Sequence, residues 1–177
     1  MVFELDNSDK STLRFRKAWV WPDSVQRFFK KNVKSPSLHV FSGSSMLGDT
    51  RVDIVKPPKT NATVIANTLD NLPFRDDCFQ TVFGDPPWHI AKHLRSRIMY
   101  ELRRVCKPHG EIILNANWTP NRLRGCVLLE AILISVGRMP FGNAAMIIRW
   151  VKLHEENEIR KSIYDSRLQT VLKSRLV

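Results

Sequence analysis

The stretch Asp85-Pro86-Pro87-Trp88 is the most informative part of this chain, and the fold can be worked out on either side of it. Residues 78–84, directly before it, form a short apolar run that predicts a buried strand. After Trp88 the apolar residues recur at helical spacing. An acid, two prolines and an aromatic ring therefore stand at the carboxyl end of a strand, which is the edge where ligands bind in open α/β sheets.

The segment after Trp88 predicts a helix of about 18 residues. Its apolar residues share one face because they recur every three or four positions: Ile90, Leu94, Ile98, Leu102 and Val105. Lys107-Pro108-His109-Gly110 ends this helix, and residues 111–116 predict the next strand.

Further elements follow from the same patterns. Residues 23–33 predict a helix, and a second, largely buried helix is expected over residues 124–136. Further strands are expected at residues 38–41, 50–55, 62–66 and 144–151, the last paired with a short strand near residues 139–141. Strands that alternate with helices predict an α/β fold with a mostly parallel sheet, helices on both faces and a C-terminal antiparallel hairpin strand.

Composition and length set the wider limits. A chain of 177 residues that is 43% hydrophobic suits one globular domain. We expect a basic N-terminal extension with one helix over residues 1–36, a main domain over 37–151, and a charged helix or tail over 152–177. No apolar run reaches membrane-spanning length, and residues 1–6 do not have the pattern of a secretory signal.

Charge and cysteine usage indicate partners and compartment. The net charge of +11 favours a polyanionic partner such as nucleic acid, because Lys and Arg gain affinity by releasing counterions from phosphates, although a basic inert surface is the alternative. The three cysteines form no CxxC pair, which argues against a zinc site or a disulfide framework and fits a reducing cytoplasm.

The tetrapeptide at 85–88 resembles the catalytic motif of S-adenosylmethionine-dependent methyltransferases that modify the exocyclic amino group of adenine or cytosine, which reads Asp, Asn or Ser, then Pro-Pro, then an aromatic residue. Two other stretches are similar to this family: Leu72-Pro73-Phe74 before the strand, and residues 101–110, which resemble its structural helix-to-strand turn. The resemblance implies a Rossmann-like class I methyltransferase in a compact form similar to small archaeal and viral members.

The resemblance also implies a site for S-adenosylmethionine. Phe41-Ser42-Gly43-Ser44 occupies the place of the family's glycine-containing cofactor loop, although only Gly43 and Gly48 remain of the usual pattern. Asp53 would accept hydrogen bonds from the ribose hydroxyls, or it is simply a solvent-facing strand residue. Asp85 would border the cofactor as well.

The adenine ring of the cofactor is expected against the segment before Leu72. The residues that carry this expectation are Thr68, Leu69 and Asp70. Thr68 stands where the family often has an acid, and the acid here is Asp70, so the sequence does not settle which of them contacts the adenine. Leu69 would supply its backbone amide.

The predicted catalytic residues are Asp85, Pro86, Pro87 and Trp88. An aryl amine is a poor nucleophile because its lone pair is delocalised into the ring. Hydrogen bonds from the amine to the Asp85 carboxylate and to the Pro86 carbonyl would free that lone pair. The two prolines pre-set the backbone for this contact. The alternative is a proline-rich turn from strand to helix with a packing tryptophan.

The substrate base is expected to stack on Trp88, a contact worth on the order of 1–3 kcal/mol, and it must be single-stranded or flipped out. His89 and the pair Asn117-Trp118 would line its pocket, with core packing as an equal alternative for Trp118. A basic outer face on the helix after Trp88 slightly favours a phosphate track over a merely solvated face: Lys92, Arg95, Arg97, Arg103 and Arg104.

Two other chemistries fit the sequence less well. Residues 43–50 match the phosphate-loop pattern except that Asp49 replaces the lysine, and its carboxylate would repel a triphosphate. His89 and His93 have metal-ligand spacing on a helix but lack a third ligand, so we predict no metal site.

The sequence therefore predicts a methyltransferase that uses S-adenosylmethionine and acts on adenine or cytosine in nucleic acid. RNA is slightly favoured over DNA, because no stretch is long enough for an added target-recognition domain, and a protein partner could supply recognition instead. The rival interpretations are a catalytically idle nucleic-acid-binding subunit of the same fold and a methyltransferase acting on a protein or small molecule.

Overall fold

A computed structural model describes residues 2–5, 13–16, 21, 23–87, 90, 92–116, 118, 123–135 and 144–154 of the chain. Its elements, in chain order, are β1 (Val2–Leu5), β2 (Leu13–Arg16), α1 (Asp23–Asn32), β3 (Ser37–Val40), β4 (Thr50–Asp53), β5 (Val64–Ile65), β6 (Phe79–Gly84), α2 (Lys92–Val105), β7 (Cys106–Asn115), β8 (Cys126–Ser135) and β9 (Ala144–Lys152).

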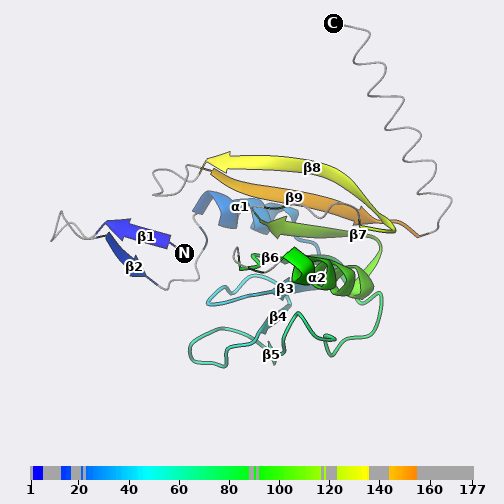
Figure 1. Cartoon of the computed structure of the whole chain (residues 1–177), viewed down its shortest axis with the longest axis horizontal. Helices are drawn as coiled ribbons and strands as arrows, with labels where there is room; N and C mark the ends of the chain where they lie inside the picture. The colour runs from blue at the N-terminus through cyan, green and yellow to red at the C-terminus, as the bar shows by residue number, and fades with distance from the viewer. Residues whose placement is uncertain are drawn as a thin grey trace, which may run out of the picture.

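Seven of the strands form one sheet in the order β5-β4-β3-β6-β7-β9-β8 (Figure 1). The five strands from β5 to β7 are parallel, and β9 runs antiparallel between β7 and β8. This arrangement confirms the predicted α/β fold with a mostly parallel sheet and an antiparallel hairpin at its C-terminal end. Strands β1 and β2 pair with each other in a separate antiparallel sheet that the sequence patterns did not predict.

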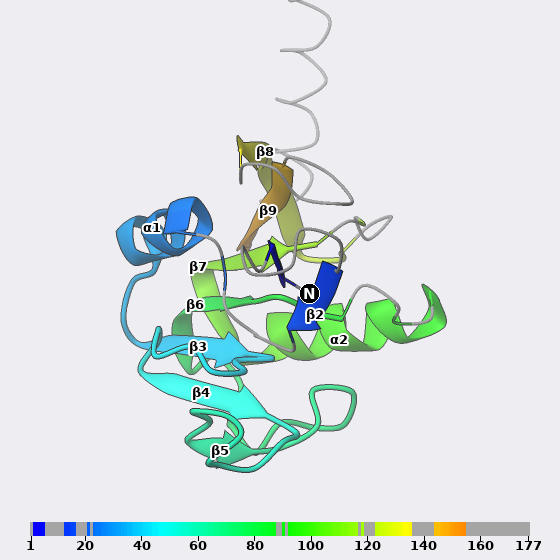
Figure 2. The same ribbon diagram turned by 90° about the vertical axis from the view of Figure 1, so that its left-hand side faces the viewer.

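Helices α1 and α2 lie on opposite faces of the sheet (Figure 2). Helix α1 buries Val25 and Phe29 against Phe83, Ile113 and Ile147. Helix α2 buries its apolar stripe in the larger core cluster on the other face, together with Leu38, Val82 and Ile112. The helical spacing found in the sequence is therefore the spacing by which both helices pack.

The segment 124–136 was predicted as a helix, and this prediction is wrong: Cys126–Ser135 is strand β8. The run is apolar nearly throughout, so its periodicity does not separate a buried helix from a strand. Pairing with β9 over Cys126↔Lys152 to Ser135↔Ala144 satisfies its backbone, and Ile132 and Ile134 turn toward the α1 face. The β-branched residues Val127, Ile132 and Ile134 were the local signal for a strand.

Other predictions differ in extent or fall outside the described residues. Helix α2 has 14 residues, and strand β5 has two. Strand β7 begins at Cys106. Lys107-Pro108-His109-Gly110 therefore belongs to this strand, whose register opposite β6 is irregular. The strand expected near 139–141 and nearly all of the tail expected over 152–177 lie outside the described residues. The division of the chain at residues 36 and 151 stays a prediction. Among the described residues, no helix has the length and apolar character needed to cross a membrane.

Strands β3 and β6 are neighbours in the sheet although β4 and β5 lie between them in the chain. The strand order therefore reverses between β3 and β6. The crevice outside the carboxyl ends of strands at such a switch point is the general place for ligands in open α/β sheets.

Candidate functional site

The loops after β3, β4, β6 and β7 meet at one edge of the sheet. Val40 at the end of β3 pairs with Val52 on one side and with Gly84 on the other, and Gly84 pairs with Leu114 of β7. A side chain at Gly84 would place its Cβ 2.3 Å from the Val40 carbonyl oxygen, so glycine is required where these strands meet. The register therefore brings the residues after Val40 and after Gly84 side by side.

The turn after β3 is held in an unusual backbone conformation. Phe41 and Gly43 have φ angles of 55° and 50°, the left-handed region that favours glycine. The Ser42 amide donates to the Val52 carbonyl at 3.0 Å, and the Ser45 amide donates to the Ser42 carbonyl at 2.9 Å. The Ser42 side-chain oxygen is buried with no hydrogen-bond partner among the described residues. Since buried hydroxyls are normally paired, the unpaired Ser42 oxygen at the sheet edge is a candidate ligand contact.

Asp53, at the end of β4, ties the two predicted cofactor segments together. One carboxylate oxygen accepts from the Gly43 amide at 2.9 Å, and the other accepts from the Val55 amide at 2.9 Å. A carboxylate has about four acceptor positions, so two remain for other donors. The exposed Ser44 is held beside β4 as well, because the Asn61 side chain donates to its carbonyl at 2.6 Å.

The segment expected to face an adenine ring folds back on itself. The Leu69 amide donates to the Asn67 side chain at 3.1 Å, and the Asn67 side-chain amide donates to Asp70 at 3.1 Å. Thr68 is buried at 3% exposure, whereas Asp70 is exposed. The Leu69 amide is therefore already paired, and Thr68 lies in the interior rather than on the rim of the edge.

Asp85 is half-buried directly after β6 and accepts a hydrogen bond from a distant residue. The Trp21 indole Nε1 donates to Asp85 Oδ2 at 3.0 Å across 64 positions of sequence. Sequence reasoning missed this contact, because Trp21 precedes α1 and no local pattern connects it to β6.

The rings around Trp21 form a cluster on the α1 face of the sheet. Trp21 stacks on Phe29 at 4.2 Å and on His39 at 4.9 Å between ring centroids, and His39 stacks on Phe83 at 4.4 Å. Burial lowers the pKa of His39 to about 3, against the opposing effect of its hydrogen bond with the Leu47 carbonyl. His39 is therefore a neutral ring at physiological pH, and the cluster carries no charge.

A chain of contacts leads from the two prolines to Trp118. Pro86 is buried, and the Pro87 carbonyl accepts from the Ile90 amide at 3.1 Å. The Ile90 carbonyl accepts from Arg95 Nε at 3.1 Å, and the Arg95 guanidinium lies 5.1 Å from the centre of the Trp118 ring. Trp118 is 7% exposed and belongs to the core, which is the packing alternative, but its indole Nε1 is buried without a partner among the described residues.

The expected phosphate track on α2 needs correction. Lys92 and Arg97 are exposed, but Arg95 holds the loop after the prolines, and the Arg103 Nε atom is buried. Arg104 donates to Glu101 of the same helix and to the Phe74 carbonyl and the Asp76 carboxylate of a neighbouring loop. The helical wheel alone did not show that three of the five basic residues on this face contact protein.

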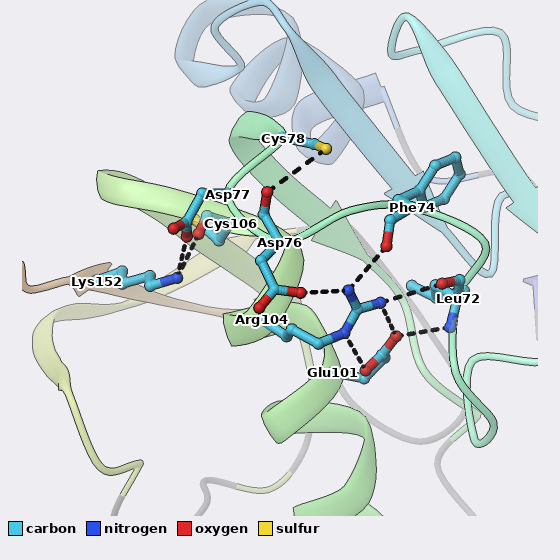
Figure 3. A network of polar contacts seen from close by, with 9 residues as sticks. All are labelled: Leu72, Phe74, Asp76, Asp77, Cys78, Glu101, Arg104, Cys106 and Lys152. Carbon is cyan, nitrogen blue, oxygen red and sulfur yellow. Dashed lines mark hydrogen bonds and ion pairs between the residues drawn. The ribbon is translucent and has the colours of Figure 1, made fainter.

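Arg104 and Glu101 of α2 clamp the loop that follows the predicted adenine segment (Figure 3). Glu101 accepts from the Leu72 amide at 2.6 Å, and Arg104 donates to the carbonyls of Leu72 and Phe74 at 3.1 and 2.8 Å and to Asp76 at 2.8 Å. Hydrogen bonding to Arg104 lowers the pKa of Glu101. The network fixes residues 72–76 against α2, a positioning role that the sequence pattern did not reveal.

Several predicted site residues lie outside the described part of the chain: Trp88, His89 and Asn117. His93 is exposed, and no cluster of three or more His, Cys, Asp or Glu side chains occurs within the described ranges. Asp49 accepts from the Ser37 amide at 2.7 Å, and the segment 43–50 leads into strand β4 rather than into a helix. A phosphate loop requires that helix, so the triphosphate alternative is not supported.

Comparison with known proteins finds similarity only at the level of structure. No protein-family model and no curated protein sequence matches the chain. It is similar to the putative methyltransferase solved in complex with the Trm112 methyltransferase activator of Haloferax volcanii, with a TM-score of 0.55, 12% identity, and coverage of 75% of this chain and 90% of that one.

Two further structures show the same likeness. TrmN from Thermus thermophilus has a TM-score of 0.52 at 17% identity over 66% of this chain and 43% of its own. The N-methyltransferase NodS from Bradyrhizobium japonicum has a TM-score of 0.53 at 6% identity over 73% of this chain and 92% of its own. The sheet order, the helices on both faces and these neighbours agree: the chain has the Rossmann-like α/β fold of class I methyltransferases.

Proposed function

We propose that this chain is an S-adenosylmethionine-dependent methyltransferase that modifies the exocyclic amino group of adenine or cytosine in nucleic acid, with RNA slightly favoured over DNA. The observation that carries the proposal is the placement of Asp85-Pro86-Pro87 at the switch point of a class I methyltransferase fold, beside the turn after β3. Fold alone does not fix an activity, so the proposal rests on these residues.

The residues at the sheet edge fit the cofactor. Phe41-Ser42-Gly43-Ser44 would form the turn beneath it, with the unpaired Ser42 hydroxyl as a donor or acceptor. Asp53 keeps acceptor capacity for ribose hydroxyls. Leu69 and Asp70 would border the adenine, with the buried Thr68 behind them. When bound, S-adenosylmethionine supplies an electrophilic methyl group.

The chain's own part in the reaction is to hold the amine. The Asp85 carboxylate and the Pro86 carbonyl accept the two amino hydrogens, which draws the nitrogen lone pair out of the ring. Pro86 and Pro87 fix φ at both positions, so less backbone freedom is lost when the acceptors meet the base. Trp88 stacks on the base, and His89, Asn117 and Trp118 border its pocket.

The proposal also includes a protein partner and a location in the cell. A protein partner for substrate recognition is proposed because the Haloferax methyltransferase was solved with an activator protein. Equal methylation rates for the purified chain and for a cell extract would remove the need for such a partner. We also propose a cytoplasmic location, since Cys78, Cys106 and Cys126 are all free thiols.

The test is transfer of a labelled methyl group onto total RNA and genomic DNA. Wild-type protein should label one pool, and Asp85→Ala should lose at least about 100-fold in rate while it still binds the cofactor. Lys30→Gln, an exposed change on α1, is the control for general damage. Label in neither pool from protein that binds the cofactor would contradict the nucleic-acid substrate and favour a protein or small-molecule acceptor. An Asp85→Ala variant with full activity would favour an idle binding subunit.

A further inference from the structure

We propose that Trp21 is a positioning residue for Asp85: its indole N–H holds one carboxylate oxygen so that the carboxylate is oriented before the substrate amine binds. The inference rests on the proposed function, because it assigns Asp85 the task of accepting the amino hydrogens. It adds a residue outside the motif, contributed by the segment before α1.

The contact has the geometry of a full hydrogen bond. The distance from Trp21 Nε1 to Asp85 Oδ2 is 3.0 Å, and the acceptor is a carboxylate, which strengthens the bond relative to a neutral pair. Both side chains are half-buried at the edge of the sheet, where competition from water is reduced. Indole nitrogen is a donor only, so Trp21 can orient Asp85 but cannot take over its role as an acceptor.

The indole is itself fixed, which is what a positioning residue requires. It stacks at 17° to the Phe29 ring and at 29° to the His39 ring, and both of those side chains are buried. The Gln26 side chain donates to the Trp21 carbonyl at 2.9 Å and so ties its backbone to the first turn of α1. The direction of the indole N–H is therefore set by contacts with α1 and β3.

Fixing the carboxylate matters because methyl transfer needs the amine aligned with the sulfonium. A carboxylate has about four acceptor positions, and the indole N–H uses one of them. When the carboxylate cannot rotate, less orientational entropy is lost as the transition state forms. The expected signature is a loss in turnover with little change in binding.

The first experiment compares Trp21→Phe with replacement of residue 21 by β-(3-benzothienyl)alanine, which keeps the bicyclic shape and removes the N–H. With the nucleic acid that the wild type methylates, both should lower kcat by about 10- to 100-fold, with KM and cofactor Kd within about twofold. The control Phe28→Leu changes the same ring cluster, in which Phe28 meets Phe29 edge-on at 5.6 Å, and should keep kcat.

The second experiment reads the contact without catalysis, from the indole N–H signals of the protein labelled with 15N-tryptophan. The chain has five tryptophans, and the resonance missing in Trp21→Phe is that of Trp21. This resonance should shift and exchange faster with solvent in Asp85→Ala, while a Phe28→Leu sample keeps it near its wild-type position.

Three outcomes separate the two claims. If the wild type is active and both variants at position 21 keep its kcat, the inference is overturned and the proposed function stays intact. A Trp21 resonance that does not respond to Asp85→Ala also overturns it. Wild-type protein that transfers no methyl group to either pool overturns the proposed function itself, whatever the resonance does.

Discussion

His39 shows how burial sets the charge of a single side chain. The ring is 1% exposed, and burial lowers its pKa to about 3, while the unfolded chain titrates near 6.5. Below pH 6.5 the unfolded state binds a proton that the folded state does not, so the free energy of unfolding falls as the pH falls, by at most about 1.4 kcal/mol per pH unit.

The prediction is that this acid-side loss of stability depends on His39. In His39→Phe, which keeps an aromatic ring in the cluster, the free energy of unfolding should change much less between pH 6.5 and about 5 than in the wild type. Urea unfolding at several pH values measures both slopes. Carboxylates with lowered pKa, such as Glu101, contribute only at lower pH. Equal slopes in the two proteins would mean that His39 takes up its proton without unfolding.

Single residues also show where sequence reasoning stops. The motif at 85–88 could be identified because its residue types are contiguous. Trp21 could not be assigned to it, because its contact with Asp85 spans 64 positions and depends on how α1 docks on the sheet. The role of Leu69 depends on a local turn, in which its amide donates to the Asn67 side chain two residues earlier.

At the scale of elements, α2 does more than cover the sheet. Its last turns hold the loop at residues 72–76 through Glu101 and Arg104. Arg104 lowers the pKa of Glu101, so the ionised pair stabilises the fold above the usual Glu pKa of 4.5, and this contribution is lost as the pH falls below it.

Glu101→Gln should therefore lower the free energy of unfolding by about 1.5–3 kcal/mol at pH 7, because Arg104 loses a charged partner and the buried Leu72 amide keeps only a neutral one. Denaturant melts at pH 7 and pH 4 measure the cost, which should shrink at the lower pH. Arg97→Gln, on the exposed side of the same helix, should stay within about 0.5 kcal/mol of the wild type. If the two variants are equally stable, the contacts of Glu101 with Arg104 and Leu72 contribute nothing to the free energy of unfolding.

Strand β8 illustrates why one element was misassigned. Its leucines at 128, 129 and 133 remain 51%, 51% and 73% exposed, so the segment is only half-buried at the edge of the sheet. A run that is apolar on both faces was interpreted as a buried helix, because the sequence does not say that one face is left uncovered. In contrast, α1 and α2 were predictable because their apolar stripes match the faces that they bury.

At the scale of the whole molecule, the alternation of strands and helices predicted the sheet, its parallel majority and its closing hairpin. The net charge of +11 remains the main argument for a nucleic-acid partner. The distribution of that charge could not be predicted from the sequence, since Arg95 and Arg104 on α2 contact protein while Lys92 and Arg97 face solvent.

If α2 tracks a single-stranded phosphate backbone, Lys92 and Arg97 should account for a measurable part of the salt dependence of RNA binding. Replacing both by Glu should reduce the slope of log K against log salt by about 1.4, that is about 0.7 for each phosphate that is no longer neutralised. The control reverses Lys30 and Lys31 on the exposed side of α1, with the same change in net charge. Equal slopes for the two double variants would place the nucleic acid elsewhere.

The most direct test of the account is the position of the transferred methyl group. Nucleosides from RNA and DNA treated with the wild-type protein and labelled S-adenosylmethionine would be separated and identified by mass spectrometry. The account predicts label on the exocyclic nitrogen of adenine or cytosine, and none with Asp85→Ala. Label on the ribose, on a ring nitrogen or on protein would contradict it, because none of those acceptors is the exocyclic amino group of a base.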